Sequence, residues 1–340
     1  MKKQQLFFHH DNIVSLDHGD PFYLKKFSHQ ICGKHLFFSI PKKIIEEINK
    51  INPEFVSRNN ESFDGGDGFT DLVRITSIAN LDLLIEEHQQ LVGNEFLRKV
   101  AEGHLLFNGD KYGVQRVVVD RVGNDEDSKL IITFFKTDYF THQVFRSIYK
   151  QLKSEGHAIA SIDSTIGVSR YFPFFTSFGI NALVVLEKEG FEEVVLAERS
   201  GKITKDNQNI WHVTVNEGLS MTDIEDQTIS LSRCLNRGLR EELGLKETHY
   251  EKINNKYFYD LFINLDDLEM GLTAVVFTEF EFNTIKTLYR SAKDAELETT
   301  GLISVKATKG DLYRFLKTNK TTKACAYLLH MFVARKTDFF

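Results

Sequence analysis

The stretch Arg237-Gly238-Leu239-Arg240-Glu241-Glu242-Leu243-Gly244-Leu245 carries the strongest structural signal in this chain of 340 residues. At about 100° per residue, an apolar stripe would run along one face of a helix through this stretch. That stripe contains Leu231, Leu235, Leu239 and Leu243. Glu242 falls inside the angular range of the stripe, and Glu241 lies on its flank. Glycine is a common residue just after a helix, so Gly244 marks the end. The pattern predicts a helix over residues 228–243.

Two neighbouring carboxylates at the end of a helix need a physical explanation. A carboxylate directed toward apolar surroundings is costly unless it is paired or binds a cation. Both acids also oppose the negative end of the helix dipole. A hard divalent cation would relieve this charge, and Mg²⁺ is the usual choice where phosphates are substrates. Two interpretations stay open from these residues alone: Glu241 and Glu242 hold a cation, or they are solvated and paired with Arg or Lys.

The segments around this helix have the pattern of a sheet. Residues 180–186 predict a buried strand, 187–190 a turn, and 194–197 the returning strand. Residues 211–215 predict another strand, which leads into Asn216-Glu217-Gly218. Further strands are expected near 256–264, 271–280 and 302–305, and helices at 309–317 and 321–335.

The first half of the chain predicts an α+β domain without recognisable chemistry. Leu36-Phe37-Phe38 is strand-like, and Ser39 is expected to cap a helix whose isoleucines follow helical spacing up to Pro53. The loop with Asp64, Asp67 and Asp71 only faintly suggests calcium, because its spacing is not that of an EF-hand. We expect an N-terminal α+β domain over 1–160 and a second domain over 170–340.

The Arg237–Leu245 stretch resembles the Nudix box, in which a helix carries Arg-Glu-apolar-x-Glu-Glu-x-Gly-apolar. Arg237, Leu239, Glu241, Glu242, Gly244 and Leu245 fit that motif. The predicted hairpin ending in Glu198-Arg199-Ser200, and the strand from Trp211 to Gly218, resemble the elements that precede the motif. The resemblance covers roughly residues 178–335. It implies a Nudix-like mixed-sheet α/β/α sandwich in the second half of the chain.

Two departures from the Nudix pattern bear on activity. Gly238 stands where the family has a Glu that commonly holds the metal or acts as base. The loop from Gly218 to Arg237 is about five residues longer than the family spacing, and Glu217-Gly218 replaces the usual Gly-Gly. The Glu that normally follows in this loop has no clear match, although Glu225 or Asp226 could serve.

The resemblance implies metal-assisted hydrolysis of a pyrophosphate. Glu241 and Glu242 would hold Mg²⁺ or Mn²⁺, and Arg237 would orient these carboxylates or meet phosphate charge. A further acid would complete the metal site, with Glu296 preferred over Asp294 and Glu298; a solvated acidic turn is the competing interpretation. The expected substrate-binding residues are Arg199, Trp211, Glu217 and Gly218. Trp211 could stack on a nucleobase, or it could simply pack in the strand.

Three hypotheses about function stay open. The first is a divergent Nudix-type hydrolase that cleaves a nucleoside diphosphate linked to another group. The second is a catalytically degenerate Nudix-fold module that binds a nucleotide or a protein partner without hydrolysis, which Gly238 favours. The third is an assembly protein in which the first domain does the work. The expected small-molecule partner is of the nucleotide type, and a homodimer is possible.

The composition of the chain argues against several classes of protein. The chain has 42 Lys and Arg against 48 Asp and Glu, a net charge of -6, so it carries no strong nucleic-acid signal. Its three cysteines are far apart and support neither a disulfide framework nor a zinc site; Cys234 is expected in the core. No stretch approaches the roughly 18 apolar residues of a membrane helix. The sequence predicts a cytoplasmic protein without a membrane partner.

Overall fold

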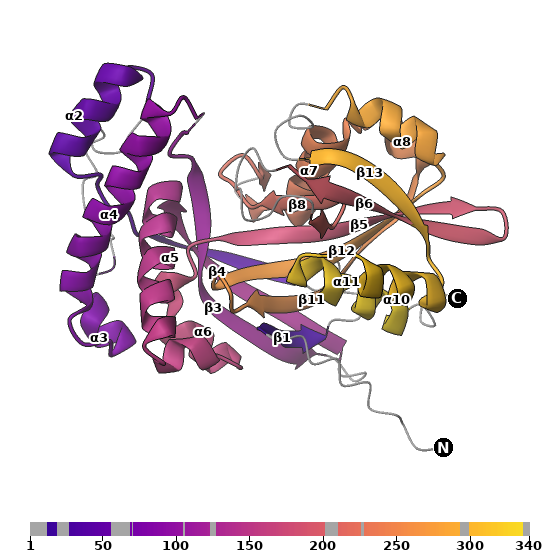
Figure 1. Ribbon diagram of the computed structural model, residues 1–340. Helices are drawn as coiled ribbons and strands as arrows, with labels where there is room; N and C mark the ends of the chain where they lie inside the picture. Colours follow the sequence, from indigo (N-terminus) through magenta and orange to yellow (C-terminus); the bar gives the residue numbers. More distant parts are fainter. Residues whose placement is uncertain are drawn as a thin grey trace.

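The computed structural model describes residues 12–18, 27–55, 69, 71–104, 106–122, 127–200, 210–225, 228–292 and 299–335. Figure 1 shows a helical first half beside a second half built on a large sheet. No helix among these residues is long and apolar enough to cross a membrane.

The large sheet has eight strands, six of which follow the order β1-β11-β12-β5-β6-β13. The two short strands β7 and β8 pair with β6 and β5. Strands β12 and β5 run parallel, and the other neighbours are antiparallel, so the sheet is mixed as predicted. The strands are β1 (Ile13–His18), β5 (Phe178–Lys188), β6 (Phe191–Arg199), β7 (Trp211–His212), β8 (Val215–Gly218), β11 (Ile253–Asn264), β12 (Glu269–Thr278) and β13 (Thr299–Lys306).

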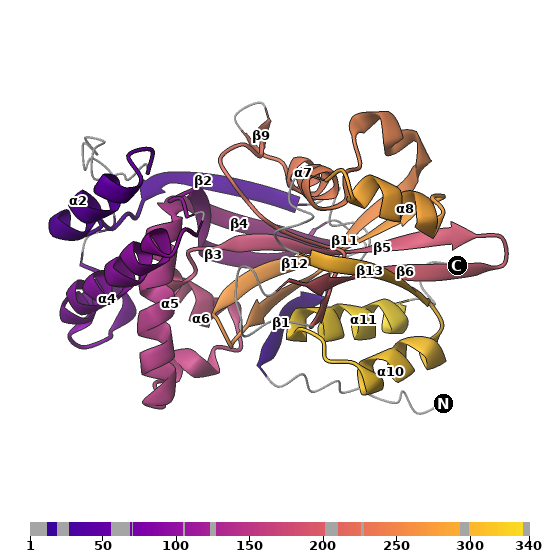
Figure 2. The same ribbon diagram turned by 45° about the horizontal axis from the view of Figure 1, so that its top comes forward.

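Helices cover both faces of this sheet. The helices α7 (Leu231–Leu243) and α8 (Phe282–Tyr289) lie on one face, and α10 (Lys309–Thr318) and α11 (Lys323–Arg335) lie on the other (Figure 2). Alternation along β5 explains both contacts, because successive side chains point to opposite faces. Val184 and Leu186 pack in the cluster that holds the α7 leucines. Leu183 and Val185 pack in the cluster that holds Leu312 and Phe315.

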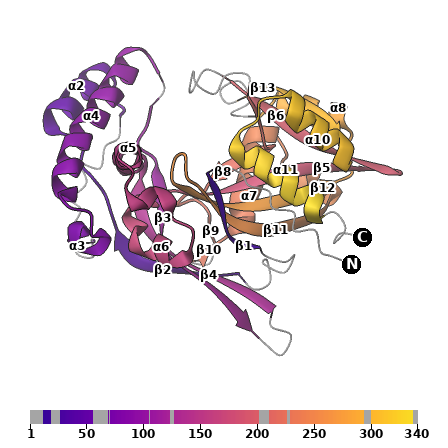
Figure 3. The ribbon, with the colours of Figure 1, turned by 60° about the horizontal axis from the view of Figure 1, so that its bottom comes forward.

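The first half contains a three-stranded sheet of order β2-β4-β3 and a layer of helices. Its strands are β2 (Phe27–His35), β3 (Asp110–Val122) and β4 (Asp127–Asp138). Its helices are α2 (Lys42–Ile51), α3 (Leu72–Thr76), α4 (Leu81–Ala101), α5 (Tyr139–Ser154) and α6 (Thr165–Arg170). Asp138 caps α5 by accepting a hydrogen bond from the Thr141 backbone N–H at 2.8 Å, as an N-cap aspartate does. Figure 3 shows these elements gathered on the side of the molecule away from α8 and α10.

The two halves share one apolar core. Buried residues of α2, α4 and α5 belong to the same continuous cluster as the leucines of α7. Strand β1, near the start of the chain, pairs with β11, so residues 13–18 lie in the sheet of the second half. Two short 3-10 turns, at 158–161 and 172–174, link α5 and α6 to β5. The division of the chain at residues 160 and 170 stays a prediction.

Some local expectations differ from the structure. The motif helix begins at Leu231 rather than 228, because residues 228–229 form strand β10, paired with β9 (Ile224–Glu225), and Ser230 caps the helix. Leu36-Phe37-Phe38 is irregular, since the preceding strand β2 has already ended at His35. Ser39 does not cap α2, whose N-cap residue is Pro41.

Candidate functional site

Helix α7 ends at the residue that its sequence predicts and begins three residues later than predicted. The Ser230 side chain accepts a hydrogen bond from the Arg233 backbone N–H at 3.2 Å. Gly244 adopts φ 71°, and its N–H donates to the Arg240 carbonyl, so the helix stops there. The side chains of Leu231, Leu235, Leu239 and Leu243 are buried, and so is that of Cys234. This packing fixes the rotation of the helix and therefore the direction of every motif side chain.

Arg237 is the centre of the motif. Its guanidinium donates to Glu217 Oε1 at 2.6 Å, to the Gly218 carbonyl at 2.6 Å and to both carboxylate oxygens of Asp223 at 2.9 and 2.8 Å. Glu241 Oε2 lies 3.9 Å from the same group. Although burial opposes its charge, these carboxylates hold the pKa of Arg237 well above its usual value. Arg237 thus closes the long loop onto the helix.

Asp223 is the acid of the loop before α7 that pairs with the motif arginine. Its side chain is 1% exposed. Glu225, one of the two candidates for this role, is exposed, and Asp226 lies outside the described residues. No spacing rule pointed to Asp223, because the loop length differs from the family pattern and the path of the loop cannot be derived from composition.

The two neighbouring acids of the motif have different surroundings. Glu242 Oε1 accepts a hydrogen bond from the Asn216 backbone N–H at 2.9 Å. Glu241 lies 3.2 Å from the Arg240 guanidinium as well as near Arg237. At 18% exposure its side chain is largely covered. Glu242 therefore helps to hold α7 against β8, whereas the arginines near Glu241 lie on α7 itself.

Gly238 is a packing position. A Cβ atom there would lie 2.5 Å from Val215 Cγ1 and 2.9 Å from Glu217 Cβ. Such distances are far below van der Waals contact, so α7 approaches β8 too closely for any side chain at residue 238. The missing carboxylate of the motif cannot simply be restored in this backbone.

The acids do not form a recognisable metal centre in the part of the chain that the structure describes. No three His, Cys, Asp or Glu side chains are placed there to hold a metal ion together. Glu296, with Asp294 and Glu298, lies outside the described residues, and so do Asp64 and Asp67 of the first-half loop. Mg²⁺ is commonly held by one or two carboxylates together with waters and substrate phosphates, and Glu241 and Glu242 are the motif carboxylates that would supply such ligands. The Mg²⁺ or Mn²⁺ site stays a prediction.

A cleft of about 430 Å³ lies beside β8; it is lined by β5, β8, the ends of β11 and β12 with the turn between them, and the start of α11, and the first half contributes Lys111. Two of the predicted substrate residues, Arg199 and Gly218, line it, and so does Asn216, which contacts Glu242. Glu217 faces Arg237 instead. Trp211 packs edge-on against Phe315 of α10, with ring centroids 6.0 Å apart, and does not line the cleft.

Several polar groups that line the cleft had no signal in the sequence. Lys111 comes from β3, and Glu269 begins β12. Burial opposes the ionisation of Glu269, but His142 at 3.6 Å, Arg146 at 3.9 Å and the charge of Lys111 hold its pKa at about 2. His212 shares a 2.7 Å hydrogen bond with Thr322 Oγ1 through Nδ1, and its buried Nε2 has no hydrogen-bond partner among the residues that the structure describes. Burial and the charge of Arg199 hold the pKa of His212 well below its usual value.

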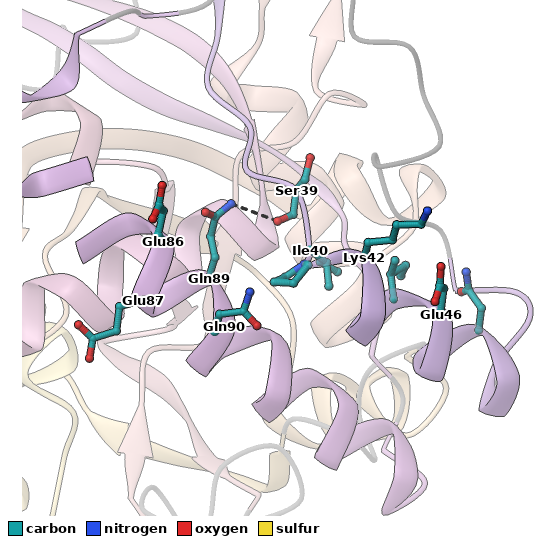
Figure 4. A pocket seen from close by; sticks show the side chains of 11 residues that line it. Ser39, Ile40, Lys42, Glu46, Glu86, Glu87, Gln89 and Gln90 are labelled. Atoms are coloured by element: carbon teal, nitrogen blue, oxygen red, sulfur yellow. Dashed lines mark hydrogen bonds between the residues drawn. The ribbon is translucent and has the colours of Figure 1, made fainter. Parts of the chain in front are cut away.

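A larger hollow of about 900 Å³ lies in the first half, between α2 and α4. Figure 4 shows its lining, in which Gln89 donates to the Ser39 carbonyl and Glu86 and Glu87 point from α4. None of the predicted site residues lies there. The cleft beside β8 is therefore the candidate site.

Among known structures, several have a fold that is similar to about half of this chain. A mutT/nudix family protein from Listeria innocua is 15% identical, with a TM-score of 0.31 over 48% of this chain and 96% of its own. The NUDIX domain of Shewanella oneidensis NrtR, solved with ADP ribose, is 11% identical, with a TM-score of 0.30 over 47% of this chain and 86% of its own. A Nudix hydrolase from M. Smegmatis, RenU, is 11% identical, with a TM-score of 0.28 over 48% of this chain and 85% of its own.

No protein-family model matches the sequence, and no curated protein matches it.

Proposed function

We propose that the second half of this chain binds a phosphate-bearing small molecule of the nucleotide type in the cleft beside β8, without hydrolysing it. The observation that supports binding is the cleft itself, which is lined by Arg199 and His212. No carboxylate of the described residues lies within 4.0 Å of the Arg199 guanidinium, since none of the ion pairs includes it. A cation without an anionic partner in a polar cleft favours an anionic ligand.

The motif geometry supports binding over hydrolysis. Gly238 leaves no room for the carboxylate that the resemblance requires. The Arg237 guanidinium donates hydrogen bonds to Glu217 and Asp223, and the Asn216 N–H donates one to Glu242. In this arrangement the motif residues brace the loop that forms one wall of the cleft.

A panel of nucleotides, tested by thermal shift with and without Mn²⁺, checks this proposal. We expect one or more nucleoside diphosphates to raise the melting temperature without release of monophosphate, following the stabilisation expected of a ligand that prefers the folded state. Arg199→Met should remove most of this shift, and Arg233→Met, an exposed arginine on α7, should not. No stabilisation by any member of the panel would contradict the proposal.

A divergent hydrolase acting on a nucleoside diphosphate linked to another group is the second candidate, favoured by the adjacent acids Glu241 and Glu242. It predicts monophosphate release that depends on Mg²⁺ or Mn²⁺ and is lost in Glu242→Gln. Glutamine keeps the oxygen that accepts the Asn216 N–H, so this variant should fold. Glu247→Gln, an exposed acid just after the motif, is the matched control.

A further inference from the structure

The first half of the chain contributes a cation to the cleft. Lys111, on β3, lines it, and its Nζ donates to Ser177 Oγ at 3.3 Å. Across from it, a Cβ atom at Gly218 would lie 3.6 Å from this Nζ. Gly218 is paired with Gly179 of β5, another residue of the cleft. Because Gly218 has no side chain, the space next to the Lys111 ammonium on this side stays open.

No carboxylate in the described part of the chain lies within 4.0 Å of Lys111 Nζ, and its hydrogen-bond partner is a neutral hydroxyl. The acids whose charges act most on Lys111, Glu269 and Glu217, are already paired with arginines: Arg146 lies 3.9 Å from Glu269, and Arg237 lies 2.6 Å from Glu217. A half-buried ammonium without a close counter-ion costs free energy that a folded protein normally avoids.

The other acids along the cleft are also neutralised by cations outside it or at its rim. Asp266 lies 2.5 Å from Lys323 and 3.4 Å from Lys153, and Asp267 accepts from Arg146 Nε at 2.9 Å. Among the described residues that line the cleft, Lys111 of the first half and Arg199 of the second are the cations with no carboxylate within 4.0 Å.

We propose that Lys111 is a ligand-binding residue that makes the site a joint property of both halves, by binding an anionic oxygen group of the cleft ligand beside Gly218. This rests on the proposed binding function and extends it, because it assigns the first half a direct role in recognition. Since the cation has room around it and a hydroxyl at hand, a phosphate or pyrophosphate group has the charge and the acceptor oxygens that fit it.

Inorganic pyrophosphate, titrated into the full chain by calorimetry and thermal shift, tests this. We expect Lys111→Met to weaken pyrophosphate binding by about tenfold or more, as for the loss of a charge-assisted hydrogen bond. Lys111→Arg should restore part of it. Lys256→Met is the matched control, because Lys256 is also half-buried, also donates to a neutral side-chain oxygen (Asn236 Oδ1, 2.6 Å) and lies outside the cleft.

A second readout separates this inference from the proposed nucleotide function. If Lys111 is an unpaired cation in the free protein, Lys111→Met should unfold at a higher temperature than the wild type when no anion is present. Pyrophosphate binding that depends on Lys111, with no nucleotide bound, would support the inference and overturn the nucleotide proposal. Equal pyrophosphate binding in the wild type and Lys111→Met would overturn the inference even if nucleotides bind. No pyrophosphate binding in the wild type would also overturn it.

Discussion

At the scale of single residues, Gly238 decides what the motif can do. Gly238→Ala should lower the free energy of unfolding by about 1–3 kcal/mol, because an added Cβ would overlap Val215 and push α7 away from β8. Gly310→Ala is the control, since this helical glycine in α10 has nothing within 4 Å of an added Cβ. Urea denaturation of both variants measures the difference. Equal stabilities would show that α7 can shift without cost.

Arg237 is the second residue whose loss should be costly. Arg237→Met would leave Asp223 buried without its guanidinium partner, and removing one member of such a pair typically destabilises by about 3–5 kcal/mol. Arg240→Met on the same helix should cost about 1 kcal/mol at most, because the side chain of Arg240 is 55% exposed. Thermal unfolding of the two variants compares them, and similar losses would argue against Arg237 as the residue that closes the loop.

At the scale of elements, helix α5 holds the turn between β11 and β12. Arg146 and Lys153 pair with Asp267 and Asp266, and the Tyr149 hydroxyl donates to the Leu265 carbonyl at 2.5 Å. The same turn leads directly into Glu269. Helix α5 of the first half thus positions Glu269 and, through the turn, one edge of the cleft.

The contacts of Glu269 with this helix should make the stability of the fold depend on pH in the acid range. The pKa of Glu269, about 2, lies below its ordinary 4.5, so its ionised form stabilises the fold above pH 4.5. That contribution is lost as pH falls from 4.5 toward 2, when the carboxylate protonates. Water screens part of it, because the side chain is 42% exposed.

Glu269→Gln should therefore be less stable than the wild type at pH 7 and should approach it near pH 2. Chemical unfolding at several pH values measures both curves. Glu281→Gln, at a side chain that is 71% exposed, should change stability little. A constant difference between Glu269→Gln and the wild type down to pH 2 would contradict the low pKa.

Elements were more predictable than the site. The leucine stripe and Gly244 fixed the position and end of α7, because helical periodicity is a local property. The β5–β6 hairpin followed from two apolar runs around a turn. By contrast, α3, α6 and α8 were not expected, since helices of five to eight residues show too little periodicity to be recognised.

The candidate site was harder to predict because it is formed by contacts between residues that are distant in the sequence. Lys111 and Gly218 are brought together by the packing of β3 near β5, and no spacing in the sequence encodes that contact. Asp223 reaches Arg237 through a loop whose path depends on its own turns. Arg199 was expected only through the resemblance, and it does line the cleft.

At the scale of the whole molecule, the cleft depends on two halves that share one core. Strand β1 extends the large sheet from the start of the chain, and α5 contacts the turn that leads into β12. Ligand binding at this junction would contact both halves at once. The stabilisation on binding should therefore extend to the cooperative unfolding of the entire molecule, rather than to the motif alone.

The joint site also predicts how binding changes at alkaline pH. Burial lowers the pKa of Lys111 below its ordinary 10.5; Glu269 and Glu217 oppose this shift, and Arg237 and Arg146 add to it. The neighbouring His142 is itself held neutral by burial, so it adds no charge in this range. An anion requires the protonated amine, so pyrophosphate affinity should fall as pH rises through a value below 10.5. In Lys111→Arg that fall should disappear, because a guanidinium stays protonated.

The stability of the free protein should change with pH in the opposite direction. Its unfolded state binds the proton at Lys111 more tightly than the folded state does, so the free energy of unfolding should rise with pH over the same range. Calorimetric titrations at pH 7 to 10, with wild type and Lys111→Arg side by side, measure the first trend. Equal alkaline loss in both proteins would place the titrating group elsewhere.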